Sequence, residues 1–348
     1  MDSKKTLTSF IVRTLLAVIP VAIFAILYVI SDPFGVVHGY RPPYAPGDTL
    51  AINFNAGYVA IESYRKHNPE RHYNAFILGS SMSQNYKASW WKAHLPADAS
   101  VCHLDASMET VEGIRNKLLM LDRDGTPIHY ALVVIEEEML HRTPDEQSHL
   151  FAQHPATTSP WQWVPFHLTF FKSFKQPALV AHAIAPRHTT QALLDAKLVS
   201  GNLPQRIEEM NESYYGRFDS IIATDPNAFF TPERLAKRRF NELPRPLAPA
   251  IDARLNTRLR EIRGVFDRQG TQYLILIPPR YRRVTLNAYD HCTLNEIFGS
   301  KNVFDFSDYA PMANDPRCYY DNPAHLIAAK CKILLDSAYA RPLAPPHP

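Results

Sequence analysis

The sequence predicts an α/β protein with a parallel sheet, preceded by one membrane-spanning helix. Short apolar runs alternate with helical patterns, and the first apolar segment carries no charged side chain. The 348 residues are 46% hydrophobic, which is enough for a sizeable core. The balance of 37 Lys+Arg against 34 Asp+Glu argues against a nucleic-acid-binding protein, because such proteins usually carry a basic stripe.

The N-terminal segment has the features of a membrane anchor. Lys4, Lys5 and Arg13 precede residues 14–30, where no side chain is charged. A helix of about 20 apolar residues, rising ~1.5 Å per residue, crosses a hydrocarbon core of ~30 Å. The basic residues favour a cytoplasmic N-terminus, with the rest of the chain outside. A cleavable signal peptide is the competing interpretation, but the following SDPFGVV lacks a small-residue cleavage site.

We therefore expect a single-pass protein of the cytoplasmic (inner) membrane with a periplasmic domain. The expected parts are a cytoplasmic tail at residues 1–10, an anchor at 11–31, a Pro-rich linker and lead-in at 32–70, and an α/β domain at 71–345.

Four cysteines lie in the part expected outside the cytoplasm, where disulfides persist. A bridge among Cys292, Cys318 and Cys331 is the favoured prediction, and reduced, buried thiols are the alternative, with Cys102 as the fourth thiol. No His or Cys spacing is typical of a zinc site, so no metal is predicted.

Five short apolar runs predict the strands of the sheet. They are residues 75–79, 100–106, 130–138, 272–279 and 302–308. Helical patterns occupy residues 111–125, 251–270 and 325–340, and Gly270 is a typical helix stop. Strands that alternate with helices at this spacing pair in parallel, with helices on both faces of the sheet.

Residues 141–250 differ from the rest of the domain. They are rich in aromatic residues, His and Pro and contain no obvious strand. We expect a helical insertion over the carboxyl edge of the sheet, where doubly wound folds bind ligands. It is either a lid or an additional packing layer.

The candidate catalytic residues lie at the two ends of the domain. Ser81 follows the first predicted strand in the sequence NAFILGSSMSQNY, and Asp321 and His325 precede the last helix. Acyl transfer needs a hydroxyl nucleophile, an imidazole that takes its proton and a carboxylate that fixes the imidazole tautomer. The competing interpretation makes Ser81 a helix N-cap, a role that Ser80 or Ser83 would share.

These two motifs resemble those of the SGNH (GDSL-like) hydrolase superfamily. The likeness is to its membrane-anchored extracytoplasmic branch, which includes the teichoic-acid D-alanyl-transfer and alginate O-acetylation proteins. Gly79-Ser80-Ser81 is similar to the nucleophile block, and Tyr319-Tyr320-Asp321 with His325 is similar to the terminal block. The resemblance implies a flavodoxin-like three-layer sandwich and a Ser-His-Asp acyltransferase or esterase acting on a cell-envelope polysaccharide.

The resemblance also implies an oxyanion hole, partners and cofactor use. The oxyanion donors would be the backbone amides of Ser81 and of Ala106 or Ser107. The chemistry needs no cofactor, and a multi-pass membrane acyltransferase would supply the acyl group. Arg280 and Arg282 are candidates for binding an anionic substrate, and Trp90 for stacking on a sugar. The alternatives are a solvated loop for the arginines and core packing for Trp90.

Two departures from the family pattern favour a second hypothesis, an inactive scaffold that binds glycan or partner proteins. Asp321 and His325 are separated by three residues instead of two, so Asp308 or Asp315 are alternative orienting groups. The Asn of the third block is replaced by Glu in the segment 136–138. An ionised carboxylate cannot donate a hydrogen bond to an oxyanion.

Overall fold

The computed structural model describes most of the chain in two compact units. The described residues are 2–44, 48, 50–144, 148–200, 205–238, 243–281, 283–320 and 325–340. The N-terminal unit combines Met1–Phe54 with Trp163–Leu203, and the sheet unit combines Asn55–Gln162 with Pro204–Pro348. These boundaries differ from the predicted single domain at 71–345, because part of the insertion belongs with the N-terminal segment.

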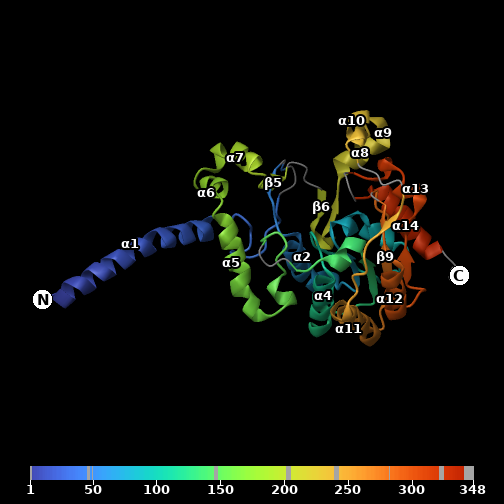
Figure 1. Cartoon of the computed structure of the whole chain (residues 1–348), viewed down its shortest axis with the longest axis horizontal. Helices are drawn as coiled ribbons and strands as arrows, with labels where there is room; N and C mark the ends of the chain where they lie inside the picture. The colour runs from blue at the N-terminus through green and yellow to red at the C-terminus, as the bar shows by residue number, and fades with distance from the viewer. Residues whose placement is uncertain are drawn as a thin grey trace. The chain divides into compact units, whose positions relative to one another are not determined.

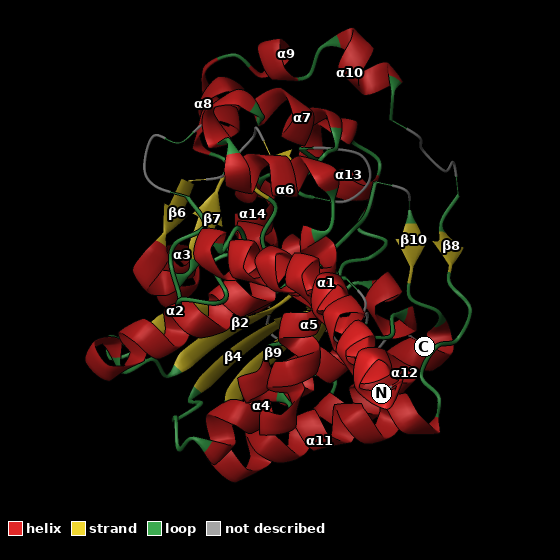
Figure 2. Ribbon diagram, turned by 90° about the vertical axis from the view of Figure 1, so that its left-hand side faces the viewer, coloured by secondary structure: helices red, strands yellow, loops and turns green. Residues whose placement is uncertain are grey.

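A parallel five-stranded sheet forms the centre of the sheet unit (Figures 1 and 2). Its order is β11-β9-β4-β2-β3, and every neighbouring pair is parallel. The strands are β2 (Ala75–Gly79), β3 (Val101–Asp105), β4 (Tyr130–Val134), β9 (Gln272–Ile277) and β11 (Val303–Asp305). All five predicted strands are confirmed, although four of them are shorter than predicted.

Helices cover both faces of the sheet because side chains alternate along each strand. Phe76 and Leu78 of β2 belong to one buried cluster, whereas Ala75 and Ile77 belong to another. The first cluster includes side chains of α2 (Ala56–Arg71), α4 (Val111–Arg123), α11 (Ala253–Gln269) and α12 (Ala288–Phe298). The second includes side chains of α3 (Ala88–Lys92), α13 (Ala310–Ala313) and α14 (Ala328–Ala340). Figure 2 shows α4 and α11 below the strands and α3 and α14 above them.

Local capping explains where the predicted helices begin and end. Thr110 caps α4 by accepting the Gly113 N–H, and Asp252 caps α11 by accepting the Leu255 N–H. Gly270 ends α11 in the left-handed conformation (φ 64°), as the sequence predicts. The three predicted helices are thus confirmed as α4, α11 and α14.

The insertion at 141–250 is mainly helical but also contains short strands, which the prediction missed. Its helices are α5 (Trp163–Phe174), α6 (Pro177–Ile184), α7 (Thr190–Asp195), α8 (Gly216–Thr224), α9 (Pro226–Phe229) and α10 (Pro232–Ala236). Its strands are β5 (Val199–Ser200), β6 (Gln205–Ile207), β7 (Glu212–Tyr214) and β8 (Arg245–Pro246). β6 and β7 form an antiparallel hairpin, and β8 pairs with β10 (Val284–Thr285).

The N-terminal unit is organised around α1 (Asp2–Ser31). Its segment Leu7–Ser31 is long and apolar enough to cross a membrane, with a mean hydropathy of 2.6. The Asp32 carboxylate accepts the N–H groups of Val36 and His38 in the turn that follows α1. β1 (Ala51–Ile52) pairs with β5 in this unit, and α5 to α7 complete it.

All four cysteines are free thiols, so the predicted disulfide among Cys292, Cys318 and Cys331 is wrong. The alternative prediction of reduced, buried thiols is correct for Cys102, Cys318 and Cys331. Cys292, on α12, is reduced but exposed. Sequence spacing does not show whether two Cβ atoms approach closely enough for a bridge.

Candidate functional site

Ser81 and His325 meet at the carboxyl edge of the sheet. Ser81 Oγ lies 2.9 Å from His325 Nε2, although the residues are 244 positions apart in the chain. Ser81 begins the 3-10 helix that follows β2, and His325 lies just before α14. The two side chains that the sequence proposes as nucleophile and base are therefore in contact. Asp321 lies outside the described residues, as does Arg282.

The turn after β2 requires glycine because the backbone of β4 passes very close to it. A Cβ atom on Gly79 would lie 2.8 Å from the carbonyl oxygen of Val134 and 2.9 Å from Cβ of Ser83. Contacts this short do not occur for real Cβ atoms, and its φ of +155° is also unusual for other residues. Gly79 thus lets the chain leave the sheet next to β4 and start a new helix at once.

The three nearby serines have different roles. Ser80 is the N-cap: its Oγ accepts the Met82 N–H at 3.2 Å and donates to Glu136 at 2.6 Å. The Ser83 hydroxyl donates to the Ser80 carbonyl at 2.7 Å. Both side chains are buried, whereas Ser81 is partly accessible. The interpretation of Ser81 as a cap is therefore wrong, because Ser80 fills that role.

Backbone and side-chain hydrogen bonds hold the segment that carries His325. The Tyr320 N–H donates to the His325 carbonyl at 2.8 Å, and Tyr319 and Leu326 form an antiparallel bridge. Asn85, at the end of the helix that Ser81 begins, donates from Nδ2 to the Leu326 carbonyl at 2.8 Å. The helix that begins at Ser81 and the segment that carries His325 are therefore directly connected.

The C-terminal part of the insertion supports the same segment. The Tyr320 hydroxyl donates to Asp219 of α8, and Arg234 of α10 donates to the Tyr320 carbonyl at 3.1 Å. Arg234 also lies over the ring of Phe229, 3.8 Å from its centroid. Residues 216–236 thus form a packing layer against the His325 segment, which is one of the two roles expected for the insertion.

A buried carboxylate, that of Glu136, contacts the start of the Ser81 helix. Glu136 follows β4 and binds the Ser80 hydroxyl and the guanidinium of Arg142. Arg142 also lies 3.6 Å from Glu138 and donates to the Glu109 carbonyl at 3.4 Å. The carboxylate therefore holds the N-cap of the Ser81 helix in place.

The neighbouring Glu137 is buried and faces Arg280 at 3.9 Å. Burial raises the pKa of Glu137 to about 8, and the nearby Arg280 guanidinium only partly offsets this.

The structure corrects one of the predicted oxyanion donors. The Ala106 N–H donates to the Gly79 carbonyl at 3.1 Å, which extends the β2–β3 ladder by one residue. This amide is therefore not free to bind an oxyanion. Within the described part of the chain, the Ser81 N–H has no acceptor.

Two predicted substrate-binding residues have structural roles instead. The Arg280 side chain is only 4% exposed and pairs with Glu138 at 3.0 Å, so its charge is already compensated. It does not lie in the solvated loop that the alternative interpretation required. Trp90 is half-buried and packs against the second core cluster, as its alternative interpretation expected.

Two alternative orienting carboxylates are engaged elsewhere. Asp308 pairs with Arg283 at 3.6 Å, and Asp315 accepts the Arg317 N–H as the cap of a short 3-10 helix.

Among the described residues, no group of three or more His, Cys, Asp or Glu side chains is placed to hold a metal ion.

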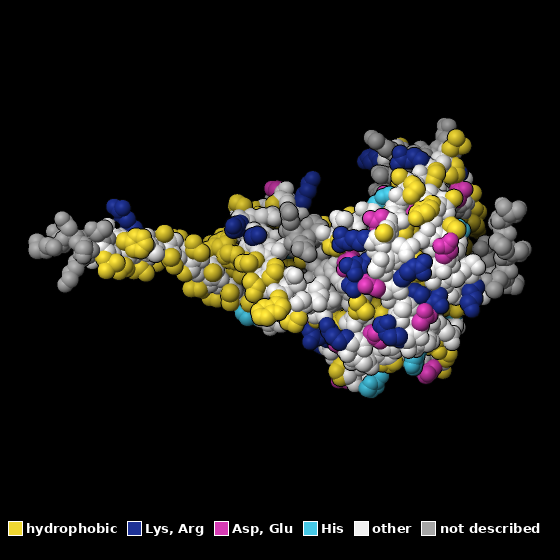
Figure 3. Space-filling model, turned by 60° about the horizontal axis from the view of Figure 1, so that its bottom comes forward, with side chains coloured by type: hydrophobic (Ala, Val, Ile, Leu, Met, Phe, Trp, Pro, Cys, Tyr) yellow, Lys and Arg dark blue, Asp and Glu magenta, His cyan; other side chains and the backbone are white. Residues whose placement is uncertain are grey.

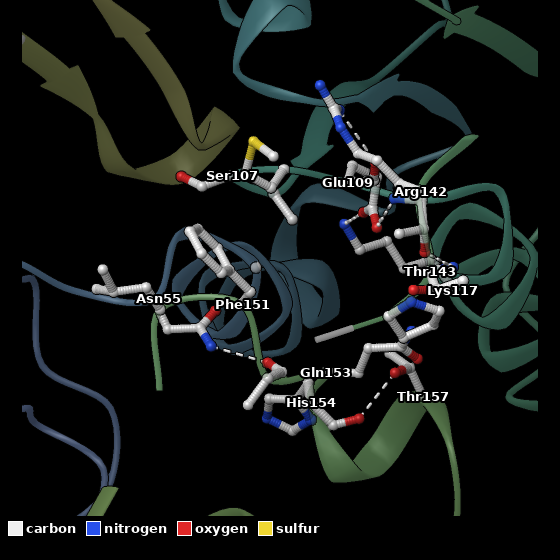
Figure 4. A pocket seen from close by; sticks show the side chains of 18 of the residues that line it. Asn55, Ser107, Glu109, Lys117, Arg142, Thr143, Phe151, Gln153, His154 and Thr157 are labelled. Carbon is white, nitrogen blue, oxygen red and sulfur yellow. Dashed lines mark hydrogen bonds and ion pairs between the residues drawn. The ribbon is translucent and has the colours of Figure 1, made fainter. Parts of the chain in front are cut away.

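A cavity of about 350 Å³ opens at the ends of β3, α2 and α4 (Figure 4). Ser107, Thr143, Phe151 and Gln153 are among the residues that line it. Two of its charged side chains are paired with carboxylates: Lys117 with Glu109, and Arg142 with Glu136 and Glu138. His154 contacts Glu62 at 3.0 Å, and burial lowers the pKa of this imidazole. Apart from Ala106 and Ser107, the loop residues that line the cavity were not predicted from the sequence. Asn85 was not predicted from the sequence either. Its hydrogen-bond partner, the Leu326 carbonyl, lies far along the chain.

No family model matches this chain, and no curated protein matches it either. The likeness to SGNH hydrolases therefore remains a prediction from two short motifs of the sequence.

Proposed function

We propose that this protein is a membrane-anchored, extracytoplasmic serine acyltransferase or esterase acting on O-acyl groups of a cell-envelope polysaccharide. The observation that carries the proposal is the 2.9 Å separation of Ser81 Oγ and His325 Nε2. A partly accessible serine in hydrogen-bond contact with an imidazole is the arrangement that activates a hydroxyl nucleophile.

In the proposed reaction, Ser81 Oγ attacks the acyl carbonyl while His325 Nε2 takes the hydroxyl proton. The Ser81 N–H stabilises the resulting oxyanion. Collapse of this intermediate expels the alcohol, which receives the proton from His325 and leaves an acyl-serine. A sugar hydroxyl or water, deprotonated by His325, then attacks the acyl-serine and releases Ser81. Asp321 remains the predicted orienting group for the imidazole.

The cavity beside Ser107 is the proposed space for the acceptor, although Ser81 and His325 are not among the residues that line it. Lys117 and Arg142, which line it, are each paired with carboxylates, so the cavity suits an uncharged, hydroxylated ligand better than an anion. The Phe151 ring offers an apolar surface for a sugar, and Thr143 and Gln153 offer polar atoms. A multi-pass membrane acyltransferase is the proposed source of the acyl group.

A fluorophosphonate probe tests the proposed nucleophile on the full chain in detergent. We expect one labelled serine and loss of labelling in Ser81→Ala and in His325→Gln. Ser337→Ala is the matched control, because this serine lies on α14 and bonds only within its helix. Labelling that persists in Ser81→Ala contradicts the proposal.

The second candidate function is the inactive scaffold, and Glu136 is the observation that favours it. A carboxylate replaces the oxyanion-binding Asn there, and losing one such donor costs on the order of 10²–10³ in rate. A folded full chain without any labelling supports the scaffold. Turnover of p-nitrophenyl acetate without a glycan acceptor instead identifies a simple esterase.

A further inference from the structure

Helices α5 and α6 carry an apolar surface that the N-terminal unit leaves uncovered. Val164 is 66% exposed, Leu168 49% and Ile184 69%, and Trp163 is also exposed. Another face of α5 carries Phe166, Phe170 and Phe174, which are buried. Apolar side chains that stay exposed together on a packed helix are typical of a surface that meets a membrane or a partner protein.

The position of this surface is fixed by contacts with α1. Phe24 packs against Phe171 and Phe174 with ring centroids 5.3 and 5.1 Å apart, and Tyr28 contacts the same two rings at 5.4 Å. α5 runs across the C-terminal end of α1 instead of along it (Figure 1). Hydrophobic side chains cover α1 and continue onto the adjoining helices (Figure 3).

The proposed anchorage places these contacts near the membrane boundary. The segment Leu7–Ser31, which is long and apolar enough to cross a membrane, has 25 residues and ends at Ser31. At ~1.5 Å per residue it is slightly longer than a hydrocarbon core of ~30 Å, so its last turns lie at the end of the span. Counted back from Ser31, Tyr28 lies about 5 Å and Phe24 about 10 Å along the helix. A helix that contacts both rings lies at the membrane boundary.

We infer that α5 and α6 form a second membrane contact, lying in the interface plane beside the spanning helix. Interfacial helices bury their apolar face about 5–10 Å deep, which matches the level of Phe24 and Tyr28. Trp163 is a residue type enriched at that level. Lys172, the one charged residue of α5, is exposed and has a long aliphatic stem that lets its amine reach the headgroups.

The inference rests on the proposed anchorage by α1, and labelled cysteine variants of the full chain test the two separately. In a Cys292→Ser background, which removes the one exposed thiol, an environment-sensitive fluorophore is attached to Val164→Cys, Leu168→Cys, Ile19→Cys or Tyr289→Cys. Ile19 reports on α1, and Tyr289, 57% exposed on α12, is the water-exposed reference. The protein is reconstituted in phosphatidylethanolamine–phosphatidylglycerol vesicles.

We expect lipids with brominated acyl chains to quench the labels at Val164, Leu168 and Ile19 several-fold more than the label at Tyr289. Iodide in the buffer should quench only the Tyr289 label. A quenched Ile19 label beside a Val164 label as open to iodide as Tyr289 overturns the inference and leaves the anchorage standing. An unquenched Ile19 label overturns the anchorage and the inference together. A Val164 label shielded from both quenchers assigns this surface to a protein contact and also overturns the inference.

Discussion

The adjacent residues Gly79, Ser80 and Ser81 have three different roles, which together leave the Ser81 hydroxyl accessible. Gly79 permits the close approach of β4, Ser80 caps the following helix and is tied to Glu136, and Ser81 is the one left accessible. The sequence shows the cluster but not this division, because it depends on the backbone of β4 and on a carboxylate more than fifty positions away.

Replacement of Gly79 by alanine tests the close approach. In Gly79→Ala the new methyl meets the Val134 carbonyl, so we expect a loss of stability of about 1–3 kcal/mol, as for overpacking. Gly264→Ala is the matched control: it lies within α11, and its Cβ has one ordinary contact, 3.5 Å from Arg268. That change should stabilise by about 0.5–1 kcal/mol. Thermal unfolding in detergent measures both, and equal midpoints for the two variants refute the argument.

Glu137 should make stability depend on pH. Its pKa is raised from 4.5 to about 8 on folding, so the folded state binds the proton more tightly than the unfolded state. The stability contribution is full below pH 4.5 and is lost as the pH rises toward 8. Between pH 5 and 8, we expect the free energy of unfolding to fall less in Glu137→Gln than in the wild type. Denaturant unfolding at several pH values measures this. The same pH dependence of the free energy of unfolding in both proteins would contradict the raised pKa.

At the scale of elements, the site depends on the pairing of the Ser81 helix with the segment before α14. Asn85 makes this connection through the Leu326 carbonyl, next to His325 in the chain. Because Asn85 contacts neither reacting atom, it is a positioning residue.

Asn85→Ala should slow the reaction at Ser81 without abolishing it. Loss of the amide leaves the buried Leu326 carbonyl without this donor, which costs about 1–3 kcal/mol and loosens the imidazole. We expect the rate of fluorophosphonate labelling to fall by roughly tenfold, since 1.4 kcal/mol corresponds to that factor. The control is Asn302→Ala, which also removes an amide donor to a backbone carbonyl, 2.9 Å from Phe298, but lies before β11. Equal labelling rates in both variants would exclude the positioning role.

The core elements were predictable because each carries its own pattern. The apolar runs at β2, β4 and β9 and the capped, amphipathic α4 and α11 form from local signals that tertiary contacts reinforce. The short strands β5 to β8 were not, since strands of two or three residues depend on a partner strand. The ion pairs of Arg280 were not predicted for a similar reason, because its acidic partners follow another strand.

At the scale of the whole molecule, the chain enters the sheet unit twice and leaves it once. It departs after Gln162, contributes residues to the N-terminal unit, and returns at Pro204. Composition alone could not reveal this division, because the aromatic residues that pack onto α1 resemble those that pack beneath the His325 segment.

The thiols provide a test of the whole fold. Cys292 alone should react with a maleimide in the native full chain, because burial shields the other three and raises the pKa of Cys318 to about 11 and of Cys331 to about 12. After unfolding without reductant, mass spectrometry should find four adducts. Two adducts after unfolding would reveal a disulfide and contradict the structure.

The hydroxyl and the imidazole that meet at 2.9 Å lie just after the first strand of the sheet and just before its final helix. Because a chain is synthesised from its N-terminus, the serine is made long before the histidine. Until the segment that carries His325 has docked, Ser81 is an ordinary alcohol without an imidazole contact. Assembly of the Ser81–His325 pair is thus timed by completion of the chain.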